Sequence, residues 1–134
     1  PRSGMILAGV RGDREGTYLD AARLLMERTD LTLFAGTHTS LAVVALNVPL
    51  SKAQLTKIAQ MAQDGLARAV RPVHTLYDGD TVFAVSVARD EDAPCLDVTV
   101  AGTAAAEVLA DAVVRAVTSA ESLGGIPCRA EWEA

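Results

Sequence analysis

The sequence is poor in aromatic residues and in positive charge. Aromatic residues make up 4% of the 134 residues although hydrophobic residues make up 50%, so a core has to be built from Ala, Val and Leu. That apolar content exceeds what a disordered chain carries, and the length suffices for one domain with a core. With a net charge of −5, the chain lacks the excess of Lys and Arg that phosphate binding requires. We therefore expect no nucleic-acid partner.

Cysteine occurs twice, at Cys95 and Cys128, which excludes a disulfide framework. Neither cysteine has the spacing to another Cys or to a His that metal sites use, and we expect no metal and no other cofactor. No apolar run reaches the roughly eighteen residues that span a bilayer, and no segment reads as a signal peptide. These absences predict a cytoplasmic protein with reduced thiols and no membrane partner.

The first part of the chain predicts a strand, a hairpin and a helix. The chain begins without an initiator methionine, and the apolar residues 5–8, which read as a buried strand, follow almost at once. We therefore expect it to be the C-terminal portion of something longer. The charged, glycine-punctuated residues 11–16 predict a loop or hairpin. Thr17 and Asp20 have capping-box spacing, which predicts a helix that begins at Thr17 and fades near residues 29–30.

The remainder predicts two apolar strands and two long helices. Residues 40–47 and 81–88 read as strands, and Ser51 with Gln54 predicts the capping box of a helix that Pro72 closes. A last helix is expected over residues 97–121. Its predicted apolar stripe consists of Val100, Ala104, Val108, Ala112, Val113 and Val117. Strands this apolar are covered on both faces or pack sheet on sheet, so we expect a helix-sheet-sheet-helix sandwich once an upstream half is added.

Thr39 stands at the start of the first of these strands. Threonine is an ordinary strand former, so its position alone does not make it a nucleophile. If the bond before Thr39 were cut, the residue would carry a hydroxyl together with a base, the new α-amine, which titrates at about 7.7–8.0. His38 is a poor base for this hydroxyl, because adjacent side chains in extended backbone point to opposite faces.

Asp78-Gly79-Asp80 precedes the second strand. Asp-Gly is a common turn signal, and most such turns do no chemistry. In the functional interpretation, Gly79 permits a tight turn that presents both carboxylates to Thr39 at one end of a sheet. Two acids this close do not ionise independently, so one of them is expected to have a raised pKa. They would either orient the ammonium and hydroxyl of Thr39 or shuttle a proton to the leaving amine. His74 is expected to be an ordinary loop histidine.

Segments 37–45, 64–75 and 78–85 resemble the L-aminopeptidase/D-esterase (DmpA-type) family. The string Arg-Pro-Val-His-Thr followed by Asp-Gly-Asp-Thr carries the similarity, which covers the chain from about residue 37 onward. The resemblance implies an α+β fold, the αββα sandwich related to N-terminal-nucleophile hydrolases. It also implies a precursor that cuts itself between His38 and Thr39. Residues 1–38 would then hold the end of the α-subunit region and the cleavage linker, and residues 39–134 the β-subunit region of one shared domain.

The resemblance further implies that Thr39 is the nucleophile and that Asp78 and Asp80 are the acidic pair beside it. The implied partners are a small peptide or amide substrate, the protein's own α-subunit segment and further copies, usually in a tetramer of αβ units. Other site residues of the family lie upstream and have no counterpart here. Many members have Asn before the nucleophile and Thr after it, where this chain has His38 and Ser40.

Three functions remain open from the sequence. The first is a self-cleaving amidohydrolase of the aminopeptidase type that acts on small amine-bearing peptides or amides. The second is a hydrolase of pantetheine-like amides. The third belongs to another class, a scaffold or subunit of the same fold that never matures.

Overall fold

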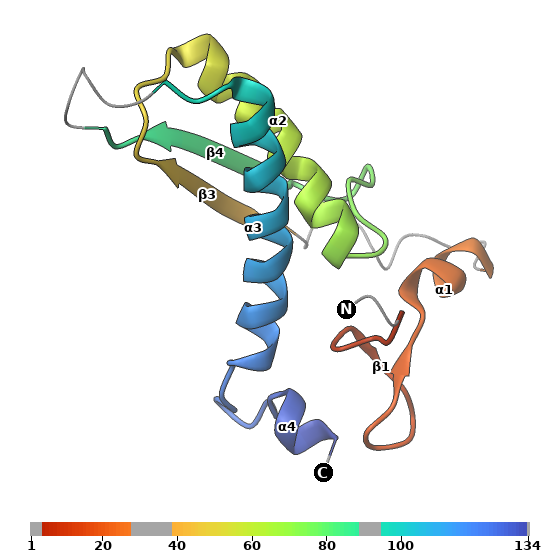
Figure 1. Cartoon of the computed structure of the whole chain (residues 1–134). Helices are drawn as coiled ribbons and strands as arrows, with labels where there is room; N and C mark the ends of the chain where they lie inside the picture. Colours follow the sequence, from red (N-terminus) through yellow and green to blue (C-terminus); the bar gives the residue numbers. More distant parts are fainter. Residues whose placement is uncertain (1–3, 28–38, 89–94, 134) are drawn as a thin grey trace. The chain divides into compact units, whose positions relative to one another are not determined.

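The computed structural model describes residues 4–27, 39–88 and 95–133 (Figure 1). Its elements are β1 (Val10–Arg11), β2 (Tyr18–Leu19), α1 (Ala21–Glu27), β3 (Leu41–Leu46), α2 (Lys52–Ala69), β4 (Thr81–Ser86), α3 (Val98–Thr118) and α4 (Arg129–Trp132). This mixture of helices and strands agrees with the predicted α+β class. The chain divides into two compact units, one of residues 1–35 with 111–134 and one of residues 36–110.

The unit of residues 36–110 is built on a parallel pair of strands. β3 and β4 pair over their whole length, with Leu41 beside Thr81 and Leu46 beside Ser86. α2 joins the two strands and packs against β4 (Figure 1). The predicted strands 40–47 and 81–88 are therefore confirmed, each shorter by a residue or two at its ends.

The start of α2 has the predicted capping box. The Gln54 amide donates to the Ser51 hydroxyl oxygen at 3.4 Å, and the Ser51 amide donates to the Gln54 side-chain oxygen at 2.8 Å. The two residues thus satisfy each other's backbone N–H groups at the helix end. The helix ends at Ala69, shortly before Pro72.

The core of this unit lies between α2, β4 and α3. Its buried side chains come from all three elements: Ile58, Ala62, Leu66, Val82, Ala101, Ala105, Ala106 and Leu109. Glycines bring the two helices together, because a Cβ on Gly65 would meet the Ala106 carbonyl oxygen and one on Gly102 would meet the Met61 sulfur. The helices therefore cross at a distance that only very small residues allow.

The predicted apolar stripe of α3 is wrong. Val100 and Val108 are 56% and 64% exposed, whereas the buried face runs through Ala101, Ala105 and Leu109. The close approach to α2 explains the difference, since Ala and Gly fit against the neighbouring backbone where valine does not. Small residues rather than large apolar ones mark the packed side of this helix.

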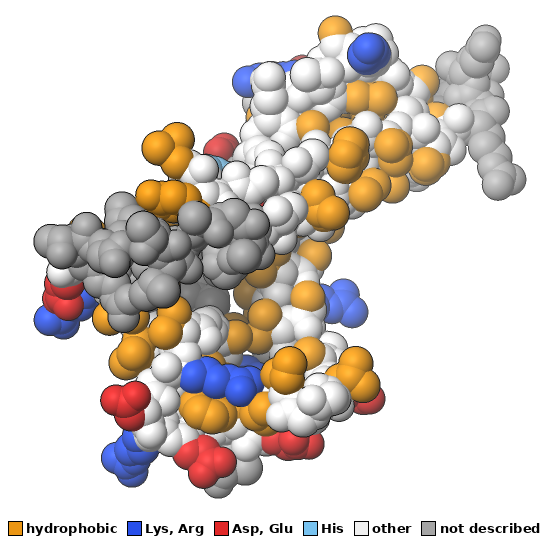
Figure 2. Space-filling view, turned by 180° about the vertical axis from the view of Figure 1, so that it is seen from behind, with side chains coloured by type: hydrophobic (Ala, Val, Ile, Leu, Met, Phe, Trp, Pro, Cys, Tyr) orange, Lys and Arg blue, Asp and Glu red, His pale blue; other side chains and the backbone are white. Residues whose placement is uncertain are grey.

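One face of the β3–β4 pair is open in the described part of the chain. Its paired side chains, Val43 beside Phe83, are 67% and 55% exposed, and Leu41 at the same face is 74% exposed. Figure 2 shows hydrophobic side chains gathered in the part of the molecule that holds these strands. The expectation that both faces of the strands are covered is therefore not met by the described residues alone.

The other unit holds a hairpin and two short helices, and it corrects two predictions. Residues 5–8 form no strand; β1 begins at Val10 because only Val10 and Arg11 find partners, in antiparallel β2. The first helix begins at Ala21 rather than Thr17, because the Asp20 carboxylate caps it by accepting from the amides of Ala22 and Arg23. The predicted hairpin at residues 11–16 is confirmed.

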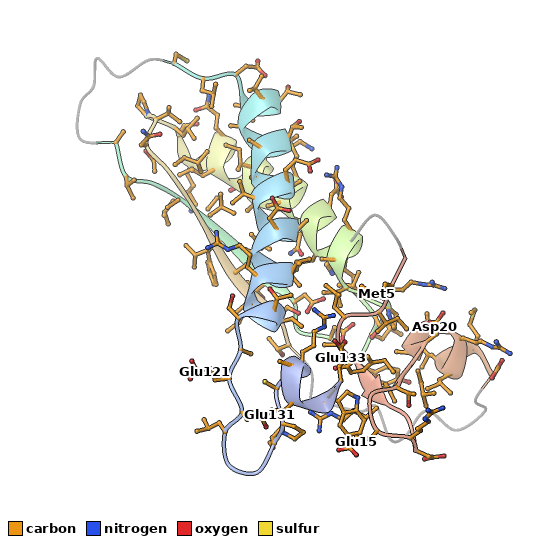
Figure 3. All side chains as sticks on the ribbon, turned by 60° about the horizontal axis from the view of Figure 1, so that its bottom comes forward. Met5, Glu15, Asp20, Glu121, Glu131 and Glu133 are labelled. Atoms are coloured by element: carbon orange, nitrogen blue, oxygen red, sulfur yellow. The ribbon has the colours of Figure 1, made fainter. Side chains whose placement is uncertain are left out.

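The C-terminal segment packs onto this hairpin. The Arg11 guanidinium lies 4.6 Å from the centre of the Trp132 ring and donates to the Pro127 carbonyl at 2.7 Å. The Trp132 indole N–H donates to the Thr17 carbonyl at 3.2 Å. Figure 3 shows Glu15, Glu131 and Glu133 around the hairpin and α4. The C-terminal segment is thus an integral part of this unit.

Among residues 4–27, 39–88 and 95–133, no helix combines the length and the apolar character needed to cross a membrane. Cys95 and Cys128 are both free thiols.

We expect Gly65→Ala to destabilise the protein more than Gly102→Ala. The new methyl group at position 65 meets the rigid Ala106 carbonyl, whereas at position 102 it meets the flexible end of Met61. Overpacking against backbone costs about 1–3 kcal/mol, while replacing a helical glycine by alanine returns about 0.5–1 kcal/mol. Urea unfolding of the two variants checks this, and a Gly65→Ala variant as stable as Gly102→Ala would contradict the close helix crossing.

Candidate functional site

The candidate site lies where β3 and β4 begin. Ser40, directly before β3, is held from both sides by the start of β4: its carbonyl accepts from the Thr81 amide at 2.9 Å, and its amide donates to Asp80 Oδ1 at 2.9 Å. The parallel register therefore brings the segment after Thr39 against the segment that carries the two carboxylates. The structure brings these predicted site residues together at one end of the strand pair.

Thr39 is exposed, and its hydroxyl lies against Gly79. A Cβ built on Gly79 would fall 2.8 Å from Thr39 Oγ1, closer than a real side chain would allow. Gly79 does not have a left-handed φ, so its conformation is open to other residues. The lack of a side chain at position 79 thus makes room for the Thr39 hydroxyl, which differs from the tight-turn role that the sequence suggested.

The Asp80 side chain is 6% exposed and is bound at both oxygens. Oδ1 accepts from the Ser40 amide, and Oδ2 accepts from the His74 amide at 3.3 Å and faces His74 Nδ1 at 3.1 Å. A carboxylate can only accept here, so the geometry places the ring proton on Nδ1. Asp80 therefore links the loop that holds His74 to the backbone next to Thr39.

These contacts set the charge of Asp80. Burial raises the pKa of this carboxyl. The hydrogen bonds from Ser40 and from the His74 amide, together with the His74 ring, lower it by more than burial raises it, so the pKa lies below its usual value. The rise expected for one member of a coupled acid pair is therefore not found at Asp80. Its carboxylate is built to stay ionised.

Asp78 is placed differently. Its Oδ2 accepts from the Thr75 amide at 2.8 Å, and its own amide donates back to the Thr75 carbonyl at 3.2 Å. Asp78 thus closes a turn of the loop, while Asp80 reaches across to the neighbouring strand. The two acids are close in the sequence, but Asp78 binds within its own loop, whereas Asp80 also binds the amide of Ser40.

His74 lies in the loop before β4, as expected, and both its amide and its ring bind Asp80. Its backbone has a φ of 57°, in the left-handed region that non-glycine residues rarely adopt, and its side chain is 39% exposed. Its spacing of six residues before Asp80 does not predict the contact between them, because that contact depends on the course of the loop. His38, the other histidine, lies outside the described residues.

The described side chains include no group of three that could hold a metal ion. What the site offers is a hydroxyl against Gly79, a hydrogen-bonded carboxylate that holds the amide of the next residue, Ser40, and a second carboxylate in the adjacent turn. Such groups suit nucleophilic and proton-transfer chemistry at a carbonyl.

Comparison with known proteins shows a match to a protein family. The model of Peptidase family S58 matches residues 4–130 of the chain. An uncharacterized aminopeptidase of Mycobacterium leprae is 46% identical over 101 residues, which are 67% of this chain and 28% of that protein. An uncharacterized aminopeptidase of Mycobacterium tuberculosis is 43% identical over 101 residues, 67% of this chain and 29% of its own length.

A second kind of relative carries a different name. The 6-aminohexanoate-oligomer endohydrolase of Agromyces sp. strain KY5R is 30% identical over 130 residues, which are 86% of this chain and 36% of that protein. The chain thus spans about a third, or less, of the length of these relatives.

The Asp80 contacts predict a loss of stability in acid. Because the folded-state pKa of Asp80 lies below the unfolded one, its contribution is complete above the unfolded pKa and disappears as the pH falls through the folded pKa. At neutral pH, wild type should therefore have a larger free energy of unfolding than Asp80→Asn. This difference should shrink below about pH 4. Urea unfolding across this range measures the difference.

Asp64→Asn is the matched control, since it removes one carboxylate from an exposed position of α2 without touching the Ser40 or His74 bonds. Parallel stability–pH curves for wild type and Asp80→Asn would contradict the assignment.

Proposed function

Because the chain belongs to Peptidase family S58, we propose that the complete protein is a self-processing hydrolase of amide bonds. The observation that supports this most is the position of the Thr39 hydroxyl, exposed against Gly79 and one residue from the amide that Asp80 holds. A nucleophile needs a fixed hydroxyl, an acceptor for its proton and an open approach. Thr39 supplies the hydroxyl, and its exposure leaves the approach open.

In the proposed maturation, the peptide bond between His38 and Thr39 is cleaved. Thr39 Oγ attacks the carbonyl carbon of His38, the carbon–nitrogen bond breaks, and the acyl group moves from nitrogen to oxygen as an ester. Water then hydrolyses this ester, which leaves a carboxylate on His38 and a free α-amine on Thr39. This route uses the backbone of His38 rather than its side chain, so the histidine at this position is compatible with cleavage.

Turnover repeats the same chemistry on a substrate. The Thr39 hydroxyl attacks an amide carbonyl while the α-amine, which titrates near working pH, takes its proton and passes it to the leaving amine. Water then releases the acyl group from Thr39 and restores the hydroxyl. Asp80 holds the Thr39–Ser40 segment throughout, and Asp78 adds negative charge close to the new ammonium.

The substrates we propose are small peptides or amides with a free amine beside the scissile bond. Two carboxylates in one short segment favour a cationic group on the substrate. The mycobacterial relatives, named as aminopeptidases, support the same class.

A second candidate substrate is an oligomer of a linear amino acid whose amine lies far from its carboxyl group. The relative named 6-aminohexanoate-oligomer endohydrolase supports this candidate, since it matches over 86% of the chain. Both candidate substrates would be hydrolysed by the same Thr39 chemistry, and they differ only in the chemical group on either side of the amide bond. Pantetheine-like amides remain a third substrate class to be compared with them.

We also propose that the open face of β3 and β4 packs against a second sheet, as in an αββα sandwich. This face exposes a group of large apolar side chains that soluble monomers usually cover: Leu41, Val43 and Phe83. The occupant we propose is the part of the protein that the relatives have outside the matched region. Four such αβ units would form the assembly that the family resemblance implies.

Thr39→Ala is expected to abolish both self-cleavage and hydrolysis, because the attacking oxygen is gone. Thr39→Ser, which keeps the hydroxyl, should still be cut. Intact-mass measurement on the complete gene product detects the break before residue 39, and turnover of aminoacyl amides, 6-aminohexanoate oligomers and pantetheine compares the substrate classes.

Persistent single-chain protein with wild-type Thr39 would instead support the third possibility, a scaffold that never matures. Cleavage of Thr39→Ala at the same bond would show that another group attacks.

Phe83→Lys is expected to disrupt the packing of the two subunits, since it places a charge in the proposed sheet-to-sheet contact. Leu76→Lys is the control, because Leu76 is fully exposed in the loop before β4. Size-exclusion chromatography of the two variants measures the outcome. A Phe83→Lys protein that assembles like Leu76→Lys would contradict the sandwich.

A further inference from the structure

The contacts of His74 form a continuous path to the proposed nucleophile. His74 binds Asp80 Oδ2 through its ring Nδ1 and its backbone amide, and Asp80 Oδ1 binds the Ser40 amide. The Ser40 nitrogen belongs to the peptide bond that Thr39 forms with Ser40. Two side chains therefore connect the loop to the backbone of Thr39.

From this path we propose that His74 is a positioning residue for Thr39, acting through Asp80. The inference rests on the proposed function, in which the Thr39 hydroxyl is the attacking group. His74 fixes one carboxylate oxygen, so that the other stays on the Ser40 amide and the Thr39 hydroxyl keeps its place against Gly79.

The backbone of His74 supports this role. Its φ of 57° costs free energy, and such residues persist where the surrounding contacts hold them. Here the holding contact is Asp80 Oδ2, which accepts from both the amide and the ring of the same residue.

The burial of Asp80 supports it as well. At 6% exposure this carboxylate has little access to water, so the loss of a donor at Oδ2 is not readily replaced. The freed carboxylate would turn toward other donors and release the Ser40 amide. His74, at 39% exposure, itself remains accessible from solvent and does not belong to the packed core.

The test compares His74→Asn with His74→Asp in the complete gene product. Both residues tolerate a left-handed backbone and have nearly the same shape. Asn places an N–H donor close to the position of Nδ1, whereas Asp places a second negative charge against Asp80. Self-cleavage and turnover should be kept in His74→Asn and reduced in His74→Asp by about 100-fold, the loss typical of a reacting group displaced by about 1 Å.

A double-mutant cycle separates positioning from a general structural role. In the Asp80→Asn background, His74→Asp should cause no further loss of rate, because the carboxylate that it repels is gone. Leu76→Ala, in the same loop, should leave the rates unchanged. Thermal unfolding and circular dichroism of every variant establish that folded proteins are compared.

Two outcomes would overturn the inference. One is His74→Asp cleaving and turning over at the wild-type rate, and the other is an equal loss from His74→Asp with and without the Asp80 carboxylate. Thr39→Ala is run in parallel: if it still cleaves, the proposed function fails, whereas an inactive Thr39→Ala beside a fully active His74→Asp overturns only the role of His74.

Discussion

The parallel pairing of β3 and β4 is the constraint on which the candidate site depends. The strands are six residues long, so an antiparallel arrangement would separate Thr39 from Asp80 by about 20 Å. α2 makes the parallel arrangement possible, because its 18 residues span about 27 Å and return the chain to the end at which β3 began. Thr39 and the segment of residues 78–80 lie at the same end of the strand pair because a helix of sufficient length connects the two strands.

Within that frame the two carboxylates have different tasks. Asp80 crosses from one strand to the next and is held ionised by the groups around it, whereas Asp78 closes a turn of its own loop. The ionised state of Asp80 matters because a protonated carboxyl would give up one of its acceptor positions. In the proposed mature protein, a fixed negative charge held at the Ser40 amide would also favour an ammonium on Thr39.

The sequence predicted the elements whose signals are local. Ser51 and Gln54 mark the start of α2 by their own chemistry, and apolar β-branched residues mark the strands, so these predictions are confirmed. Predictions failed where a distant partner decides. The buried face of α3 follows from its close approach to Gly65, and α1 begins at Ala21 because Asp20 rather than Thr17 caps it. The sequence made no prediction of the pairing of His74 with Asp80, which likewise depends on the course of the loop.

The position of the Asp80 bond relative to the proposed cut has a further consequence. Asp80 holds the Ser40 amide, and Thr81 holds the Ser40 carbonyl, so both contacts lie on the C-terminal side of the bond between His38 and Thr39. Breaking that bond changes neither contact. In the proposed function, the arrangement around Thr39 would therefore persist from self-cleavage to turnover, with a new α-amine added and no rearrangement of the strands. One set of contacts would serve both proposed reactions, because it is anchored to the part of the chain that the proposed cleavage leaves intact.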